Sequence, residues 1–397
     1  KNIPMLKKLQ RRFPIFAVDT AVKVLEFHDI IPDLIMTVDA QLVNGRYLLG
    51  DSHSVPLVAE PVAFPLFRNY KGNVLFVSSF IPLSDEIETV AGERGKVAFG
   101  GSVSTNLFDL MVKMGLKNIF FLGQDLAFSG SLAHPKGSFY EEKYAFEKRD
   151  KFSTLEMMNR KQLKYLQLVR VPGNNGVDVD TTDKMLVFRN WFEGKIAEYR
   201  TEGIRVFNVS EGARINGALQ AELSEIDKYS NLDNSETLPL PEHSTYRDML
   251  NMKITRSIRE SVKPAEDEII KKLKLKFRNI SIELEELGRS VQKGVRRSKE
   301  LYENIRGGSK KRVGELVKEL DRIDVRIKEK KDVLGFISVT IQKTINRILE
   351  EYDDHLSDEE RDNKDLKVGR QSVILYEALK ESINYNLKLV NKLLEKI

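Results

Sequence analysis

The chain has 397 residues, no cysteine, 31% charged residues and a formal net charge of +5. This length predicts two or three domains, at least one of which buries a sizeable core. The absence of cysteine excludes disulfides, thiolate nucleophiles and cysteine-based metal sites. No apolar run approaches the roughly 18 residues of a membrane-spanning helix, and no secretory signal opens the chain, so we expect a cytoplasmic protein without a membrane partner.

The first element along the chain is an amphipathic segment, 2–13, which predicts a helix that leads directly into a strand. In a doubly wound sheet, a strand and a turn precede the first helix. We therefore expect a leading strand and its glycine-rich turn to be cut off, disordered or absent ahead of Lys1.

Short runs of apolar, β-branched and aromatic residues recur through the first part of the chain. They are continuously apolar, which is typical of strands buried on both faces of a parallel sheet. Amphipathic patterns at 20–30, 103–116 and 184–203 predict helices between several of them. This alternation predicts an α/β fold, an open and mostly parallel sheet with helices on both faces. The predicted strands are 15–19, 33–39, 55–60, 73–79, 96–101, 118–123 and 204–210.

Composition changes near residue 240. Residues 1–240 contain 29 Lys or Arg against 30 Asp or Glu, whereas residues 241–397 contain 35 against 29. The segment "SNLDNSETLPLPEHS" between these parts is rich in Ser, Asn and Pro, which is typical of a linker. We therefore expect a first domain over 1–228, a linker over 229–244 and a second domain over 245–397.

The second part has the pattern of long amphipathic helices over 264–305, over 310–352 and from about 366 to the end, with a break at "GGS". Long helices with short breaks predict an all-α hairpin or bundle. Its charges are most simply a solvated face, and the alternative is a basic groove for an acidic partner. Interleaved aromatic and basic residues are absent, so we expect no nucleic-acid partner.

Polar residues follow four of the predicted strands. Ligands of open parallel sheets bind outside the carboxyl ends of the strands, so these residues predict a pocket at that edge. An aspartate there can bind a ribose hydroxyl, hold a divalent metal or act as a base; for Asp19, a helix cap is the alternative. The residues are Asp19, Thr20, Asp39, Gln41, Gly100, Gly101, Ser102, Ser104, Gln124 and Asp125.

The segment "FGGSVSTNLFDL" carries the most specific of these signals. Gly100 and Gly101 let the backbone turn tightly, while Ser102, Ser104 and the amides of the next helix offer donors to a phosphate, aided by the helix dipole. The alternative is an ordinary turn whose serines cap the helix. The segment is neither a Walker A loop nor a GxGxxG fingerprint, which disfavours an ATPase or an NAD enzyme.

Three further candidates lie in polar loops. His134, beside Pro135, is a candidate general base or proton carrier, with an ordinary surface histidine as the alternative. Thr181 and Glu211 are expected to close the pocket, with a buried helix cap as the alternative. The other histidines form no metal spacing, so no zinc site is expected.

Four stretches together resemble, in order and spacing, the motility accessory factor family of bacterial flagellin glycosyltransferases. They are "FAVDTAVKVLEFHDIIPDLIMTVDAQ", "FGGSVSTNLFDLMVKMGLKNIFFLGQDLAFSGSLAHPKG", "VPGNNGVDVDTTDKMLVFRNWFE" and "FNVSEGARINGA". The resemblance spans residues 1 to about 225, and the helical tail is similar only in kind. It implies a Rossmann-like, sialyltransferase-like catalytic domain. The implied reaction transfers a nonulosonic acid, such as pseudaminic or legionaminic acid, from its CMP-activated form to Ser or Thr of flagellin.

The resemblance also implies roles for individual residues. The Gly100 turn would face the CMP phosphate, and Asp19, Asp39 and Gln41 would line the nucleotide side. Gln124 and Asp125 would lie by the sugar, and Thr181 and Glu211 would close the site. Asp125 or His134 would act as the base. The family's glycine-rich turn after a leading strand is not found in this sequence, which starts just downstream of its expected place.

Two alternatives remain open. The sheet also resembles the archaeal hydroxymethylpterin diphosphokinases, which transfer pyrophosphate from ATP to a pterin with magnesium, so Mg²⁺ is the cofactor to consider. The long helical tail argues against that compact enzyme, because a small pterin needs no large docking surface. The other alternative is a non-catalytic nucleotide-binding or flagellin-binding protein, whose tail binds flagellin or another copy of the chain in a homo-oligomer.

Overall fold

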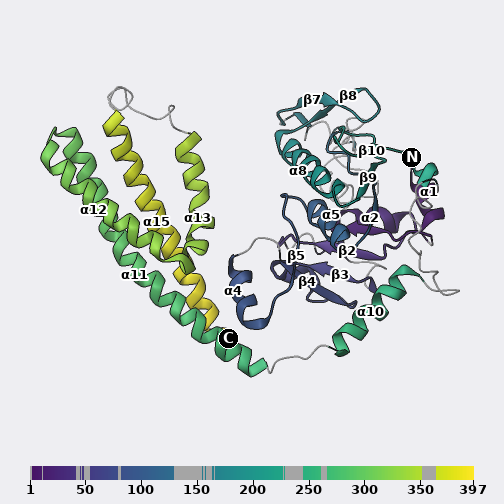
Figure 1. Ribbon diagram of the computed structural model, residues 1–397, viewed down its shortest axis with the longest axis horizontal. Helices are drawn as coiled ribbons and strands as arrows, with labels where there is room; N and C mark the ends of the chain where they lie inside the picture. Colours follow the sequence, from purple (N-terminus) through teal and green to yellow (C-terminus); the bar gives the residue numbers. More distant parts are fainter. Residues whose placement is uncertain are drawn as a thin grey trace. The chain divides into compact units, whose positions relative to one another are not determined.

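The computed structural model describes residues 2–10, 12–41, 54–78, 82–128, 166–226, 245–260, 266–350 and 364–397, with a few short pieces between them. The chain divides into two compact units. Residues 1–81 and 94–261 form the α/β unit, and residues 82–93 and 262–397 form the helical unit. Relative to the predicted boundaries, 245–261 group with the first unit and 82–93 with the second (Figure 1).

The α/β unit contains a five-stranded parallel sheet in the order β1-β2-β3-β4-β5. Its register places Ala17 opposite Ile35, and Ile35 opposite Leu57. Every residue of β2 and β3 is buried, which explains their continuously apolar sequences. The strands are β1 (Phe16–Val18), β2 (Leu34–Thr37), β3 (Leu57–Ala59), β4 (Val74–Ser78) and β5 (Gly95–Lys96).

A second parallel sheet has the order β10-β9-β6. Its strands are β6 (Asn118–Phe121), β9 (Arg205–Asn208) and β10 (Leu219–Gln220). The rings of Phe120 and Phe207 stack with centroids 4.5 Å apart across β6 and β9. Phe120 and Val209 also pack in the hydrophobic cluster that contains Ala17 and Leu57. The two sheets therefore share a core, and the predicted parallel α/β fold is confirmed.

The helices predicted within the first part are all present. Pro4 lies in the first turn of α1, where proline is favoured. The helices are α1 (Ile3–Leu9), α2 (Asp19–Phe27), the short α3 (Phe64–Phe67), α5 (Val103–Lys113), α8 (Asp183–Arg200) and α10 (Tyr246–Glu260).

Helix α10 belongs to the α/β unit because its first turn is bound there. The buried Asp33 carboxylate accepts a hydrogen bond from the Arg247 amide at 3.0 Å and another from the Ile15 amide, ahead of β1, at 2.8 Å. The Tyr246 hydroxyl donates to the Arg12 carbonyl at 3.0 Å. Such long-range bonds leave no local sequence signal, so composition alone placed 245–260 with the tail.

Several elements were not predicted, and two of them form a hairpin. Strands β7 (Val169–Pro172) and β8 (Asp178–Thr181) form an antiparallel hairpin, where we expected a polar loop around Thr181 from the sequence. The Gly173 amide donates to the Val177 carbonyl at 3.0 Å and closes the turn. Asp178 and Asp180 are poor strand formers, so tertiary contacts, described below, outweigh local propensity here.

In the described part of the helical unit, four long helices pack around one core. They are α11 (Glu266–Arg306), α12 (Lys310–Glu329), α13 (Lys331–Glu350) and α15 (Lys364–Leu394). The predicted helix over 310–352 divides at Lys330, whose φ of −84° and ψ of 63° leave the helical region. No glycine or proline marks this break. Among the described residues, no helix combines the length and apolarity required to span a bilayer.

Helix α4 (Pro82–Ala91) joins the helical unit although the strands before and after it belong to the sheet. Leu83 and Ile87 pack against the helical core. The Glu86 carboxylate pairs with the Lys276 ammonium of α11 at 2.5 Å. Helix α4 is therefore part of the helical unit, although it lies between β4 and β5 in the sequence.

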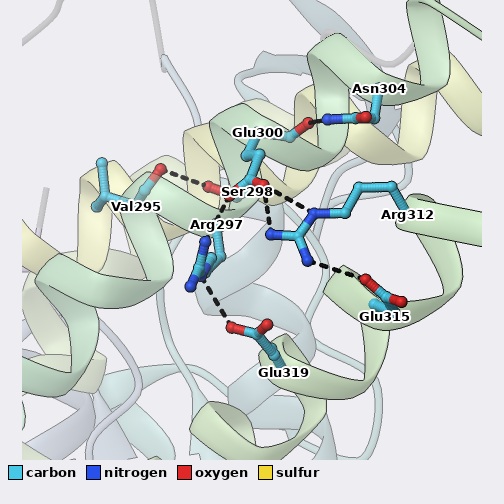
Figure 2. A network of polar contacts seen from close by, with 8 residues as sticks. All are labelled: Val295, Arg297, Ser298, Glu300, Asn304, Arg312, Glu315 and Glu319. Carbon is cyan, nitrogen blue, oxygen red and sulfur yellow. Dashed lines mark hydrogen bonds and ion pairs between the residues drawn. The ribbon is translucent and has the colours of Figure 1, made fainter. Parts of the chain in front are cut away.

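A charged network joins α11 to α12 beside the turn at 307–309 (Figure 2). Arg312 Nε donates to Glu300 Oε1 at 2.9 Å, and Arg312 Nη1 to Glu315 Oε2 at 3.0 Å. Arg297 Nη1 donates to the other Glu300 oxygen at 2.6 Å, and Arg297 Nε pairs with Glu319 at 2.8 Å. These side chains are about one third exposed, except Glu315, which is about half exposed, so we expect the network to contribute little to stability.

Candidate functional site

The ends of β1 and β2 are joined by a buried aspartate. Asp19 is 1% exposed and lies in the first turn of α2. Its Oδ2 accepts from the Thr37 hydroxyl at 2.6 Å, and its Oδ1 from the Thr20 amide at 2.7 Å. Burial raises the pKa of Asp19, the two hydrogen bonds oppose this, and the nearby Asp39 adds to it. Both oxygens are thus engaged within the protein.

Asp39 follows β2 and is more exposed than Asp19. One of its carboxylate oxygens accepts from the Gln41 amide at 2.9 Å, which forms a local turn at the strand end. Thr20 and Gln41 are exposed at the same strand ends. The four residues predicted from the first two strands therefore follow the carboxyl ends of paired neighbours in the sheet.

The Gly100 turn leads from β5 into α5. Ser102 is the N-cap residue of α5, but its side chain makes no capping hydrogen bond; its hydroxyl pairs instead with the Ser104 hydroxyl at 3.0 Å. The Ser102 side chain therefore does not cap α5, in contrast to the alternative expected from the sequence. The start of α5 keeps the dipole and amide donors that favour an anion.

The two glycines of this turn have reasons within the fold. A side chain at Gly100 would overlap the ring of Trp191 and the methyl group of Thr105. Gly101 has φ of +89°, in the left-handed region, and a side chain there would meet the ring of Phe188. Tight packing against α8 explains both glycines, so close approach of a ligand is not needed to account for them.

The residues after β6 form a second group. The Gln124 amide donates to the Ser210 hydroxyl at 2.9 Å, and the Asp125 carbonyl accepts from the Ala213 amide at 2.7 Å. A side chain at Gly212 would overlap the Asp125 carbonyl, so these two loops lie in direct contact. Burial first, and then the nearby negative Glu211, raise the pKa of Asp125. This carboxylate is therefore a stronger base than an exposed aspartate.

The β7-β8 hairpin packs beside this second group. Thr181 is fully buried, and its hydroxyl donates to the Leu126 carbonyl at 2.7 Å. The Asn174 amide group donates to the Ser210 carbonyl at 2.8 Å. Gln124, Asp125, Thr181 and Glu211 are thus brought together, although Thr181 supports the loop through its own hydrogen bond. Sequence reasoning missed Asn174, whose only signal is its place in a Gly/Asn turn.

Hydrophobic contacts connect the ends of β1 and β2 with the Gly100 turn. Val18 and Val38, which precede Asp19 and Asp39, pack in one cluster with Val103 at the start of α5. The ends of β1 and β2 and the Gly100 turn therefore approach the same edge of the large sheet. That Asp125 lies in one pocket with these strand ends and the Gly100 turn stays a prediction. His134 lies outside the described residues.

Two cavities lie elsewhere in the α/β unit. One of about 460 Å³ is lined by residues that include Ala98, Asp109, Lys113 and Tyr199, and one of about 300 Å³ lies between the end of α8 and β9. None of the predicted site residues lines either cavity. Among the described residues, no group of three or more His, Asp or Glu side chains is arranged to hold a metal ion.

Comparisons with known proteins agree with this architecture. Residues 1–131 match the family model described as 6-hydroxymethylpterin diphosphokinase MptE-like. No curated protein matches the chain. Among solved structures, the MAf glycosyltransferase from Magnetospirillum magneticum AMB-1 matches with a TM-score of 0.54 and 19% sequence identity. The match covers 99% of this chain and 53% of that one, so this chain spans about half the length of its structural relative.

At this level of identity the structural likeness establishes the fold alone. It agrees with the resemblance drawn from the sequence motifs, and the family model covers the strands that carry the first two of them. The expected resemblance is therefore supported from two directions: the first third of the chain is similar to the MptE-like family, and the chain as a whole has a fold similar to that of a motility accessory factor glycosyltransferase.

Proposed function

We propose that this protein is a glycosyltransferase that moves a nonulosonic acid from its CMP-activated form to Ser or Thr hydroxyls of flagellin. The observation that carries the proposal is the likeness of 99% of the chain to a MAf glycosyltransferase. The polar groups at the ends of β1 and β2, at the Gly100 turn and after β6 support it, because each step of the transfer needs groups of these kinds.

The donor's phosphate would bind at the start of α5. As the bond from the anomeric carbon to the CMP phosphate breaks, negative charge develops on the departing phosphate. The α5 dipole, its first amides and the hydroxyls of Ser102 and Ser104 are suited to stabilise that charge. The departing CMP would keep the electron pair of the broken bond.

The acceptor hydroxyl would be deprotonated by Asp125. Attack by an acceptor oxygen on the anomeric carbon forms a new C–O bond and releases a proton, which a nearby base must take. Burial and Glu211 raise the pKa of Asp125, which makes it a more effective base than an ordinary carboxylate. His134 is the other candidate for this role, and Gln124 would contact the sugar.

Binding experiments test the choice of donor. A thermal-shift titration with CMP should stabilise the protein, whereas ATP with Mg²⁺ should not. The second candidate function, pyrophosphoryl transfer from ATP to a hydroxymethylpterin, is favoured by the MptE-like match over residues 1–131. Stabilisation by ATP with Mg²⁺ and indifference to CMP would select that second function instead.

An activity experiment tests the base. Asp125→Asn should lower the rate of sugar transfer to flagellin by about 100-fold or more, measured by intact mass of the product. Asp178→Asn is the matched control, because Asp178 is an exposed aspartate on the neighbouring hairpin. Flagellin that keeps its full glycan mass in cells lacking this gene would contradict the catalytic role and leave the non-catalytic alternative.

A further inference from the structure

The side chain of Phe99, directly ahead of the Gly100 turn, is 55% exposed. Its neighbour Val97 is 4% exposed and packs in the core of the sheet. Single exposed apolar residues are common on protein surfaces and by themselves do not indicate a binding site. What distinguishes Phe99 is the way the backbone on both sides of it is held.

Three buried side chains of α5 bind that backbone. Asp109 Oδ2 accepts from the Ala98 amide at 2.7 Å, and the Asn106 amide group donates to the Ala98 carbonyl at 3.1 Å. On the other side, the Gly100 amide donates to the Thr105 hydroxyl at 3.0 Å. All three side chains are 1% exposed or less. Phe99 is therefore presented to solvent by a segment that the interior of the protein holds in place.

Further contacts fix Asp109, one of these three side chains. Asp109 accepts from the Tyr199 hydroxyl of α8 and pairs with Lys113 at 2.7 Å. Although burial favours its protonated form, Lys113, Tyr199 and the Ala98 amide together lower the pKa of Asp109, so it binds the loop as a carboxylate. With Trp191 packed against Gly100, the segment lies between α5 and α8.

This arrangement leaves a buried atom unsatisfied. Asn106 Oδ1 has no hydrogen-bond partner among the described residues, although Asn106 is fully buried. An unpaired buried oxygen destabilises a fold, and Asn106 is one of several residues in the described part of the chain that bury such an atom. The same Asn106 side chain holds the Ala98 carbonyl, and Ala98 directly precedes the exposed Phe99.

We propose that Phe99 is a platform on which the base of a bound nucleotide stacks, with Thr105, Asn106 and Asp109 as its positioning residues. Phe99 precedes Ser102 by three residues, a span of at most about 11 Å, which is within the reach of one nucleotide. A phosphate at the start of α5 and a base on Phe99 would be the two ends of the same ligand. That the base is cytosine rests on the proposed function.

The test compares Phe99→Ala with Phe64→Ala, since Phe64 is 54% exposed and lies in the same unit. Calorimetric titrations with CMP and with ribose 5-phosphate separate the base from the phosphate. Phe99→Ala should weaken CMP about tenfold or more and leave ribose 5-phosphate unchanged, because base–aromatic stacking is lost. Phe99→Trp should restore CMP binding, and Phe64→Ala should change neither affinity.

A positioning variant completes the design. Asp109→Asn should weaken CMP more than ribose 5-phosphate and speed hydrogen exchange at the Ala98 amide, while Phe99→Ala leaves that exchange unchanged. Equal CMP affinity in Phe99→Ala and Phe64→Ala would overturn the platform and leave the glycosyltransferase proposal standing. If ATP binds in place of CMP and Phe99→Ala weakens it, the platform holds and the proposed donor is wrong. If neither CMP nor ATP binds, both the Phe99 platform and the glycosyltransferase proposal are overturned.

Discussion

In the α/β unit, the buried aspartates described above accept hydrogen bonds from loop backbone, whereas the long helices α11 and α15 of the helical unit bury hydroxyls and amides. Asp19, Asp33 and Asp109 each accept a hydrogen bond from at least one backbone amide at the end of a strand or the start of a helix. In the helical unit, Ser382 donates to the Ile337 carbonyl at 3.0 Å, and Asn386 to the Phe336 carbonyl at 3.3 Å.

The difference reflects how each unit satisfies its backbone. Loops at strand ends have amides without a ladder partner, and a buried carboxylate can satisfy them. At Asp109 the partners outweigh the effect of burial on the pKa, whereas at Asp19 and Asp33 burial outweighs the hydrogen bonds. Helices satisfy their own amides, so polar groups between them serve mainly to align one helix with another. We therefore expect the α/β unit to be sensitive to charge and pH, and the helical unit to be sensitive to side-chain size.

The largest effect is expected at Gly294 of α11. A side chain there would overlap the ring of Tyr376 in α15, which is itself held by a hydrogen bond from its hydroxyl to Asp324 at 2.6 Å. Gly294→Ala should lower the free energy of unfolding by about 3 kcal/mol. Gly288→Ala is the control, because its Cβ would lie 3.5 Å from Ile383; it should be neutral or stabilising by up to about 1 kcal/mol. Equal urea midpoints for both variants would contradict this.

The next effect is expected at Asp109. Asp109→Asn places an amide group against donors and should lower the free energy of unfolding by about 2 kcal/mol. Because its pKa lies below the ordinary 3.8, the ionised form stabilises the fold, and this contribution is present above pH 3.8 and lost as pH falls through the lowered value. The difference in the free energy of unfolding between wild type and variant should therefore disappear at low pH, as measured by urea unfolding. A difference that is constant with pH would show that charge is not involved.

Asp19 should behave in the opposite way. Burial raises its pKa, so the folded protein binds the proton more tightly, and stability from this group is lost as pH rises through the raised value. Asp19→Asn should remove that loss, since the Thr37 hydroxyl can accept from an amide group. The variant's thermal midpoint, relative to wild type, should improve between pH 4 and pH 7. Asp19→Ala, which loses both acceptor atoms, should be less stable than wild type throughout.

The smallest effect is expected in the network of Figure 2. Arg312→Lys keeps the charge but loses the pair of hydrogen bonds that the guanidinium donates to Glu300. Since these groups are partly exposed, the thermal midpoint should fall only slightly, and the difference should vanish at about 1 M salt. A large loss that persists in high salt would mean that the α11–α12 hairpin depends on these charges as the α/β unit depends on Asp109.

Much of the α/β unit could be predicted from the sequence. The apolar runs that became β1 to β4, β6 and β9 were located to within about two residues, because buried parallel strands leave a strong continuous signal. The break at Lys330 and the β7-β8 hairpin were not, since neither depends on local propensity. The importance of Asp109 was also missed, because within "NLFDLM" it resembles any polar residue of an amphipathic helix.

By itself the sequence determined most of the strands and helices in their order along the chain, the location of polar residues after the strands and the resemblance to a family. These follow from short-range patterns of apolar and polar residues. Only the tertiary structure decided which polar groups are interior supports, which glycines are required by packing, and that Phe99 is held outward by α5. Those properties depend on contacts between residues far apart in the chain, and no local pattern records them.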